Sequence, residues 1–427
     1  MMSSRVPQFF LAILPWLFSG IVTADDGLAK LSAASREAAL VMSIDLSPTE
    51  QGHFEGAFIS DDGLALVGMG AVCGPVKPRV TVAGGAPLKF GTVLGIFPEQ
   101  DVALMKFAHR PKVWLRLAAK EPGAGESLAL VVINPKHLTD DKVPSIVGSM
   151  MAKRSAPASY LRETALVKVL SLGAGVSAEQ RHLLTNGSFS INAKGELVAF
   201  FFDFDPAKGQ TFIDLAPVSS LVTRVDELAK GNTTIPFPVP KASNPRDQAA
   251  VDGDWRIMVT AILKKERSAA RTAYQKLVKR YPDSYQLKII YLNHDLLQEE
   301  DPFGESSKFS EPAAGASAAE KILLLTLQAN THLTKDDFEG AIPYLKKAVA
   351  LCPKDFPKIR KGLADVYVKL GRLDEAEALY REAWAYWPES IETAEALAHL
   401  LDERGKYDEA IKLTDRAVEL ERIYRRP

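Results

Sequence analysis

The sequence predicts a multidomain protein in which an all-β region is followed by an all-α region, and three observations lead to this prediction. Short apolar runs separated by Gly, Pro, Asp and Asn fill residues 38–215, as is typical of strands in a barrel or sandwich. Residues 232–253 are rich in Pro, Asn and Asp, which indicates an extended linker. Beyond the linker, apolar residues recur three and four positions apart among Lys, Glu, Arg and Ala, which favours helices.

Length and composition limit the classes of function. A chain of 427 residues is long enough for two or three domains, and 25% charged residues are ordinary for a globular protein. The formal net charge of −1 gives no electrostatic reason to expect a nucleic acid partner. The only cysteines, Cys73 and Cys352, fall in different predicted domains, so we expect two buried free thiols. Because no His/Cys cluster has metal-ligand spacing, we expect neither a metal nor a cofactor.

The N-terminus has the pattern of a cleaved signal peptide over residues 1–24. Arg5 precedes the apolar run 9–22, and Val22-Thr23-Ala24 at its end provides the small residues of a cleavage site. A membrane anchor is the alternative, but the run is shorter than the roughly 20 residues a spanning helix needs, and Pro15 interrupts it. No later run is long enough to span a membrane. We therefore expect an exported protein without a membrane span after cleavage, periplasmic or extracellular, and either soluble or associated with the envelope.

Three motifs in the β region resemble the HtrA/Deg family of trypsin-like serine proteases. Residues 56–74, GAFISDDGLALVGMGAVCG, resemble the family's Gly-x-Phe-Ile strand and Asp-Asp-Gly-Leu turn, which lead to the histidine base. Residues 100–107, QDVALMKF, resemble the strand that carries the orienting aspartate, and residues 184–200 resemble the run around the nucleophilic serine. The resemblance implies a trypsin-like double β-barrel over residues 25–231.

Two of the three catalytic positions in that family pattern carry unsuitable residues. The family triad falls on Gly70, Asp101 and Asn186. Peptide hydrolysis of this kind needs an imidazole to remove the serine proton, yet glycine has no side chain and an amide is not a nucleophile at neutral pH. Leu184 also replaces a glycine that lets the oxyanion loop turn. The resemblance therefore predicts a pseudoprotease with no working catalytic residue.

An active serine endopeptidase of the HtrA type, rearranged around Ser188, is the alternative. Ser188 is the fallback nucleophile because it lies two residues beyond Asn186, and His182 is close to it in sequence. To put Ser188 instead of Asn186 at the nucleophile position, the strand register expected from the family pattern would have to shift. His182 also follows Asp101 in the chain, whereas the family's base precedes its aspartate. His53 does precede Asp101, but it lies well short of the base position.

The helical region contains an internal repeat. Gly371-Arg-Leu-Asp-Glu-Ala recurs as Gly405-Lys-Tyr-Asp-Glu-Ala, an offset of 34 residues. A period near 34 with paired amphipathic helices resembles the tetratricopeptide repeat (TPR). The resemblance implies a helical solenoid over 254–427. Its best repeats cover residues 322–355, 357–390 and 391–424, and a weaker copy lies within 255–284.

The repeats carry the predicted binding function. In such a solenoid the first helices of each pair line a groove. By repeat position, the groove-facing candidates are Asn330, Lys358, Lys361, Asp365, Lys369 and His399. The three lysines suit an acidic peptide or a C-terminal carboxylate, although a solvated helix face explains any one of them alone.

Together the two halves predict an exported protein-binding scaffold or adaptor. A protein or peptide would occupy the groove of the repeats. Apolar surface at the end of the last repeat also suggests self-association. A further alternative makes the β region an inert spacer and the solenoid the only functional part.

Overall fold

The computed structural model describes most of residues 27–424. It leaves out residues 48–49, 75, 83–84, 134–145, 159–165, 174–183, 185–186, 206–211, 232, 241–246, 248, 250–251, 283, 285, 288–289, 291–316, 334 and 355. The predicted signal peptide therefore lies outside the described residues.

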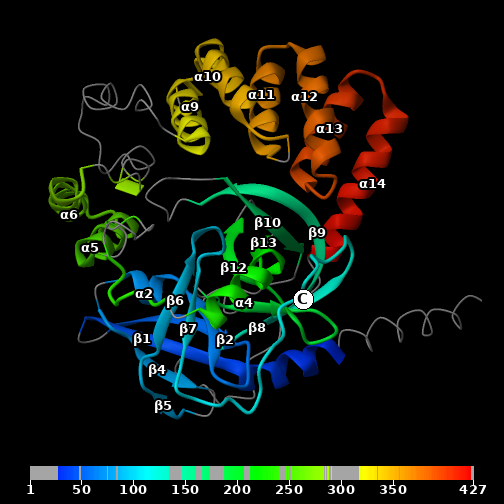
Figure 1. Ribbon diagram of the computed structural model, residues 1–427. Helices are drawn as coiled ribbons and strands as arrows, with labels where there is room; N and C mark the ends of the chain where they lie inside the picture. The colour runs from blue at the N-terminus through cyan, green and yellow to red at the C-terminus, as the bar shows by residue number, and fades with distance from the viewer. Residues whose placement is uncertain are drawn as a thin grey trace, which may run out of the picture.

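The β region consists of two antiparallel sheets (Figure 1). The first has seven strands in the order β5-β4-β1-β2-β3-β7-β6. Its strands are β1 (Ala39–Ser47), β2 (Glu50–Phe58), β3 (Leu64–Gly68), β4 (Arg79–Val82), β5 (Pro87–Leu88), β6 (Thr92–Phe97) and β7 (Val102–Lys106). The short helix α2 (Gly70–Cys73) follows β3 directly.

The second sheet closes into a barrel in the order β10-β13-β12-β11-β8-β9. Its strands are β8 (Ser127–Val131), β9 (Ile146–Pro157), β10 (Leu166–Gly173), β11 (Phe189–Ile191), β12 (Leu197–Asp205) and β13 (Phe212–Pro217). Helix α4 (Val222–Lys230) follows the last strand.

The strands of both sheets are connected in the same order. In each, three consecutive strands form a meander (β1-β2-β3 and β8-β9-β10), and the last strand pairs with the third. The fourth strand returns to pair with the first, as β4 does with β1 and β11 with β8. One apolar cluster contains residues of both sheets, such as Val41, Leu104, Val131 and Phe200, and so forms the core between them. The predicted fold class, a trypsin-like double-barrel region followed by an all-helical region, is confirmed.

The helical region is built from antiparallel pairs. They are α5–α6 (Gly253–Leu263 and Arg267–Arg280), α9–α10 (Ala318–Leu333 and Phe338–Leu351), α11–α12 (Lys358–Lys369 and Leu373–Tyr386) and α13–α14 (Ile391–Glu403 and Tyr407–Tyr424). The last three pairs form a continuous arc, whereas α5–α6 lies apart from it (Figure 1). One apolar cluster runs through the arc, including Ala329, Ala364 and Leu397 from its three first helices.

The turn inside every pair contains a residue in the left-handed region. Gly371 and Gly405 have φ values of 69° and 71°, and the residues at the same place in the other pairs, Lys265 and Asp336, have 59° and 56°. Left-handed backbone costs an L-residue roughly 1–2 kcal/mol but costs glycine almost nothing. The recurring Gly-x-x-Asp-Glu-Ala motif therefore marks the turn that starts the second helix, and two pairs make the same turn without glycine.

Part of the predicted linker lies against the first sheet. The Ile235 N–H donates a hydrogen bond to the Val93 carbonyl oxygen at 2.8 Å, next to an isolated β-bridge between the two residues. Val239 is buried in the core of that sheet. The apolar residues of this proline-rich segment thus fasten it to the β region.

The solenoid packs on the barrel of the second sheet through loops that connect its helix pairs. Trp387, between α12 and α13, is buried in a cluster with Met151 and Ala152 of β9. Its ring stacks on the guanidinium of Arg154, with 5.2 Å between the guanidinium carbon and the ring centroid. Arg154 is buried and forms an ion pair with Asp214.

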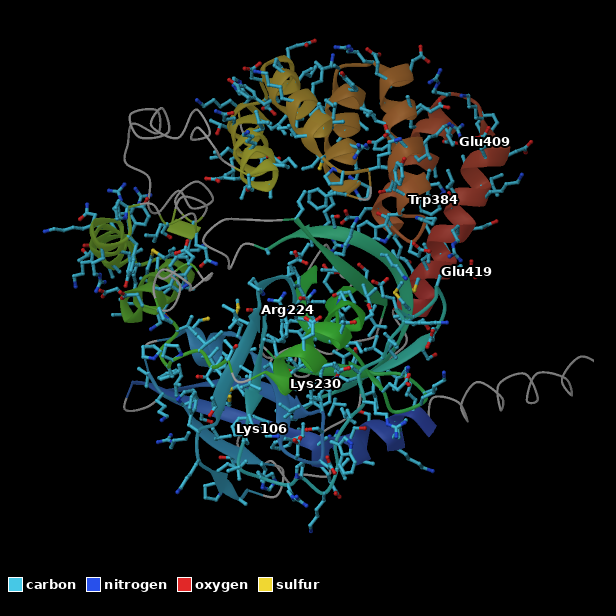
Figure 2. All side chains as sticks on the ribbon, viewed as in Figure 1. Lys106, Arg224, Lys230, Trp384, Glu409 and Glu419 are labelled. Atoms are coloured by element: carbon cyan, nitrogen blue, oxygen red, sulfur yellow. The ribbon has the colours of Figure 1, made fainter. Side chains whose placement is uncertain are left out.

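Further contacts widen this interface. Leu166 of β10 packs against a cluster of Ile322, Cys352 and Phe356, the last of which lies in the loop before α11. Figure 2 shows the Glu419 end of α14 close to β9 and the Glu409 end away from it. Aromatic residues and paired charges in one buried interface hold the two halves in a defined relative position.

In the part of the chain that the structure describes, no helix has both the length and the apolar character needed to cross a membrane.

We expect Lys265→Gly to stabilise the α5–α6 pair by about 0.5–1 kcal/mol, because glycine adopts the left-handed turn without strain. Native-state hydrogen exchange of the α5 and α6 amides measures this change. The control is Lys264→Gly. Lys264 is an exposed lysine in the right-handed region, with φ −82°, so its replacement removes no strain and loosens the pair. Slower exchange in both variants would contradict the turn assignment.

We expect Trp387→Ala to loosen the solenoid from the barrel, since it removes the buried ring that stacks on Arg154. Small-angle scattering of the full chain measures the effect as a larger maximum dimension. Tyr386→Ala, at the exposed neighbouring aromatic residue, serves as the control and should leave the scattering unchanged. Identical curves for all three proteins would show that Trp387 does not hold the two halves together.

Candidate functional site

The first two family triad positions lie side by side at the ends of neighbouring strands. Gly70 begins α2 just after β3 ends, and Asp101 directly precedes β7. Gly68 pairs with Val102 in the β3–β7 ladder, and the Met69 N–H donates to the Asp101 carbonyl oxygen at 2.8 Å. Asp101 is buried and left-handed, with φ 53°. The position of the base and that of the orienting acid therefore meet, but at Gly70 there is no side chain to act.

The third position, Asn186, lies outside the described residues, as does His182, while the two residues after Asn186 are described. Gly187 has a φ of +98°, and a Cβ added there would lie 1.9 Å from the Glu55 carbonyl oxygen and 2.8 Å from the Gly68 nitrogen. The segment that follows Asn186 thus presses against β2 and the end of β3. The structure brings this segment to the same place as Gly70 and Asp101.

Ser188, the fallback nucleophile, is bonded to a carboxylate. Its Oγ donates a hydrogen bond to Glu55 Oε2 at 2.8 Å, and both residues are 0% exposed. Glu55 pairs with Val41 across the β1–β2 ladder, on the face that packs between the two sheets. A nucleophile must come within about 3 Å of a substrate carbonyl. In this packing Ser188 has no exposed surface.

Glu55 is a site residue that sequence reasoning missed. The signal was a single acidic residue inside the otherwise apolar stretch Phe54-Glu-Gly-Ala-Phe58. An acidic side chain on the apolar face of a strand is costly to bury unless it finds a hydrogen-bond partner. That partner is Ser188, 133 residues further along the chain, which no local pattern could reveal.

A second serine contacts an imidazole. Ser43 Oγ and His53 Nδ1 are 3.0 Å apart, and both residues are partly buried. They are direct partners in the β1–β2 ladder, where opposite side chains normally touch. Ser43 lies within a regular strand rather than in a turn that aims backbone amides at a substrate oxygen. The pair is therefore a cross-strand contact of the first sheet.

The predicted groove residues all lie on first helices of the solenoid but differ in exposure. Asn330, Lys358, Lys369 and His399 are exposed. Lys361 and Asp365, by contrast, are half-buried and joined by an ion pair, with 2.9 Å between Nζ and Oδ2.

Asp365 has a second partner within its own repeat. The Tyr380 hydroxyl donates to Asp365 Oδ1 at 2.6 Å, and burial together with this carboxylate raises the pKa of Tyr380 well above its ordinary value. Asp365 thus braces α11 against α12. The exposed lysines of α11 are better placed to contact a ligand.

A buried carboxylate joins the last two repeats. Lys406 Nζ lies 2.7 and 2.9 Å from the two Glu377 oxygens, and Arg404 and Arg381 also contact this carboxylate. Burial alone would raise the pKa of Glu377. The hydrogen bonds from Lys406 and Arg381 outweigh burial, so the pKa lies below its ordinary value. Sequence reasoning missed this network, which fixes α12 against the α13–α14 turn.

Cys73 and Cys352 are both buried: Cys73 ends helix α2 and lies in the apolar cluster of the first sheet, and Cys352 lies in the solenoid. Across the described residues, no group of three or more His, Cys, Asp or Glu side chains is arranged to hold a metal ion.

We expect Gly187→Ala to destabilise the β region by more than about 3 kcal/mol, since the new Cβ would overlap the Glu55 backbone as well as strain the turn. Gly85→Ala is the matched control. Gly85 has a φ of +84° but no atom within 4 Å of an added Cβ, so only the backbone strain of about 1–2 kcal/mol should remain. Thermal unfolding of the full chain compares them. Equal shifts of Tm would show that the 187–188 segment does not press on β2.

Comparison with known proteins supports the repeat assignment. A tetratricopeptide repeat model matches residues 332–380 and 371–422, and a second such model matches residues 253–284. The solenoid therefore contains TPR repeats, including the pair α5–α6. No curated protein matches the chain.

Several solved structures are similar to parts of the chain. The active form of the Rv3671c protease from M. tuberculosis is 17% identical over 56% of this chain and 99% of its own, with a TM-score of 0.39. The HtrA-type protease AlgW, as a variant with a tripeptide, is 14% identical over 48% of this chain and 64% of its own, with a TM-score of 0.37. The MamA protein is 22% identical over 40% of this chain and 90% of its own, with a TM-score of 0.31. Because these TM-scores are low, we infer nothing from them about activity or partners.

Proposed function

We propose that this protein is an exported protein-binding scaffold. Its trypsin-like region acts as a non-hydrolytic support, and its TPR solenoid supplies the binding surface. The observation that carries the proposal is the state of the fallback nucleophile, whose hydroxyl is fully buried and hydrogen-bonded to Glu55. Export rests on the signal-peptide pattern of residues 1–24.

The chemistry of the β region supports this reading. Serine attack requires a base that takes the proton and an opening that admits the scissile carbonyl. The base position is Gly70, which offers no acceptor. At Ser188 a carboxylate does accept the hydroxyl hydrogen, but the Ser188 side chain is fully buried. A scaffold needs neither the base nor the opening.

The helical region supports a binding role. Its repeats pack on the barrel through Trp387 and Phe356, which lie in loops between helix pairs. The exposed lysines of α11 lie on the helix instead of in these loops, so the interface leaves them accessible. A row of cations on one helix suits an acidic peptide or a terminal carboxylate.

We expect fluorescently labelled acidic peptides with free C-termini to bind the full chain. The double variant Lys358→Glu/Lys369→Glu should weaken binding about tenfold or more, because it replaces two attractions by repulsions. Fluorescence anisotropy measures the affinity. Lys347→Glu, at an exposed lysine on the second helix α10, is the control and should change little. The groove assignment is wrong if no acidic peptide binds, or if the control weakens binding as much as the double variant.

An active serine endopeptidase is the competing function, favoured by the Ser188–Glu55 hydrogen bond, in which a carboxylate stands in reach of a hydroxyl. A fluorophosphonate probe on the purified chain separates the two. We expect no stoichiometric labelling at any serine, because the probe needs an activated and accessible hydroxyl. Labelling at Ser188 that disappears in Ser188→Ala would establish the endopeptidase, and labelling at Ser43 would assign activity to the pair with His53.

A further inference from the structure

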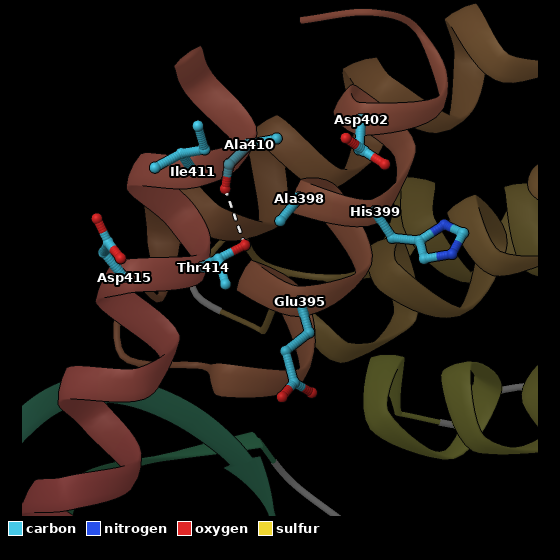
Figure 3. Close-up of a pocket in the computed structure, with 8 residues that line it drawn as sticks. All are labelled: Glu395, Ala398, His399, Asp402, Ala410, Ile411, Thr414 and Asp415. Carbon is cyan, nitrogen blue, oxygen red and sulfur yellow. Dashed lines mark hydrogen bonds between the residues drawn. The ribbon is translucent and has the colours of Figure 1, made fainter. Parts of the chain in front are cut away.

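The last repeat has a groove between its two helices, α13 and α14. A pocket of about 370 Å³ lies there (Figure 3), with Ala398 and Ala410 at its floor and Ile411 on one side. Ile411, Tyr407 and Val418 are among the most exposed large apolar side chains of the described residues, at 59%, 60% and 41%. Their spacing of four and seven places them along one face of α14, as an apolar stripe.

The repeats themselves show what such a groove holds. Ile342 of α10 occupies the same repeat position as Ile411, yet it is only 6% exposed, because α11 packs against α10. In the middle repeat the same position is Glu377, which is 7% exposed where α13 packs against α12. In both cases the cover is an amphipathic α-helix. An occupant of the α13–α14 groove that follows this geometry is therefore a helix too.

The charges of this groove differ from those of the groove before it. In the middle repeat the corresponding rim positions are Lys361 and Arg381 with one carboxylate, Asp365, between them. In the last repeat the rim carries three carboxylates, Glu395, Asp402 and Asp415, and a histidine, His399, in the place of Asp365. Repeat geometry does not require this reversal of charge. An acidic rim around an apolar floor selects an occupant with cationic flanks.

We propose that the α13–α14 groove binds an amphipathic helix of a partner protein, with aliphatic residues at i, i+3 and i+7 and Lys or Arg on both flanks. This inference rests on the proposed protein-binding function and places a second binding surface outside the row of lysines on α11. The two surfaces are opposite in charge. One chain thus offers an anion-selective face and a cation-selective groove to different partners.

The chain supplies a suitable probe. Helix α13 buries Ala394, Leu397 and Leu401, and the two leucines lie in the apolar cluster of the solenoid. A peptide of residues 390–404 therefore has an apolar face of the kind that packs on a helix pair of this solenoid. The basic probe is this peptide with Glu392→Lys, Glu395→Lys and Glu403→Lys. The unaltered peptide, with the same apolar face and acidic flanks, is the control ligand.

We expect the labelled basic peptide to bind the full chain saturably and at least about tenfold more tightly than the unaltered peptide, as measured by fluorescence anisotropy at low salt. Ile411→Ser and Glu395→Lys/Asp415→Lys should each weaken binding about tenfold, since they remove the apolar contact and reverse the rim charge. Asp61→Lys/Asp226→Lys changes net charge equally at exposed sites of the β region and should leave binding unchanged.

Three results would overturn the proposal. The first is no saturable binding of the basic peptide. The second is equal weakening by the groove variant and the β-region control. The third is a self-associated chain that becomes monomeric in Ile411→Ser by analytical ultracentrifugation, which would make a second copy the occupant. Lys358→Glu/Lys369→Glu should leave helix binding intact, so loss of acidic-peptide binding and loss of helix binding are separate outcomes.

Discussion

The close contact between the 187–188 segment and strand β2 is the constraint on which the rest of the β region depends. Gly187 approaches the Glu55 backbone so closely that a side chain cannot be accommodated, and Ser188 donates its hydroxyl hydrogen to the Glu55 carboxylate. The contact joins the second sheet to the first at the place where the family resemblance would put a catalytic centre. In the proposed function this hydroxyl joins the two sheets and does not serve a substrate.

This constraint gives the two halves of the chain different tasks. The β region is closed at its centre, and its second barrel carries the solenoid through Arg154 and Trp387. Each of these residues is buried and has partners on both sides of the contact, so the barrel acts as a base that fixes the repeats in one orientation. In the proposed function the binding surfaces are on the solenoid: the exposed lysines of α11 and the acidic rim of the α13–α14 groove.

Much of the fold could be predicted from the sequence, because it depends on local patterns. The turn motif at Gly371 and Gly405 fixed the period and phase of the helix pairs, and the turn-bounded apolar runs indicated antiparallel strands. The placement of Gly70 and Asp101 at one site followed from the family resemblance, and the β3–β7 ladder brings these two positions together.

The remaining features are contacts between distant residues, which single-sequence patterns do not encode. Glu55 meets Ser188, and Arg154 meets both Asp214 and Trp387, only after the sheets and the solenoid have packed. The α13–α14 groove escaped prediction for another reason. The charges of its rim can be read from the sequence, but the exposure of Ile411, compared with the covered Ile342, appears only in the structure.

The most direct test of the central claim is the rate at which the purified full chain cleaves an unfolded protein substrate, measured beside its Ser188→Ala variant. If the Ser188 hydroxyl is confined by Glu55 and Gly187, both proteins release peptides no faster than buffer alone. Cleavage by the natural chain that is lost in Ser188→Ala would contradict the account.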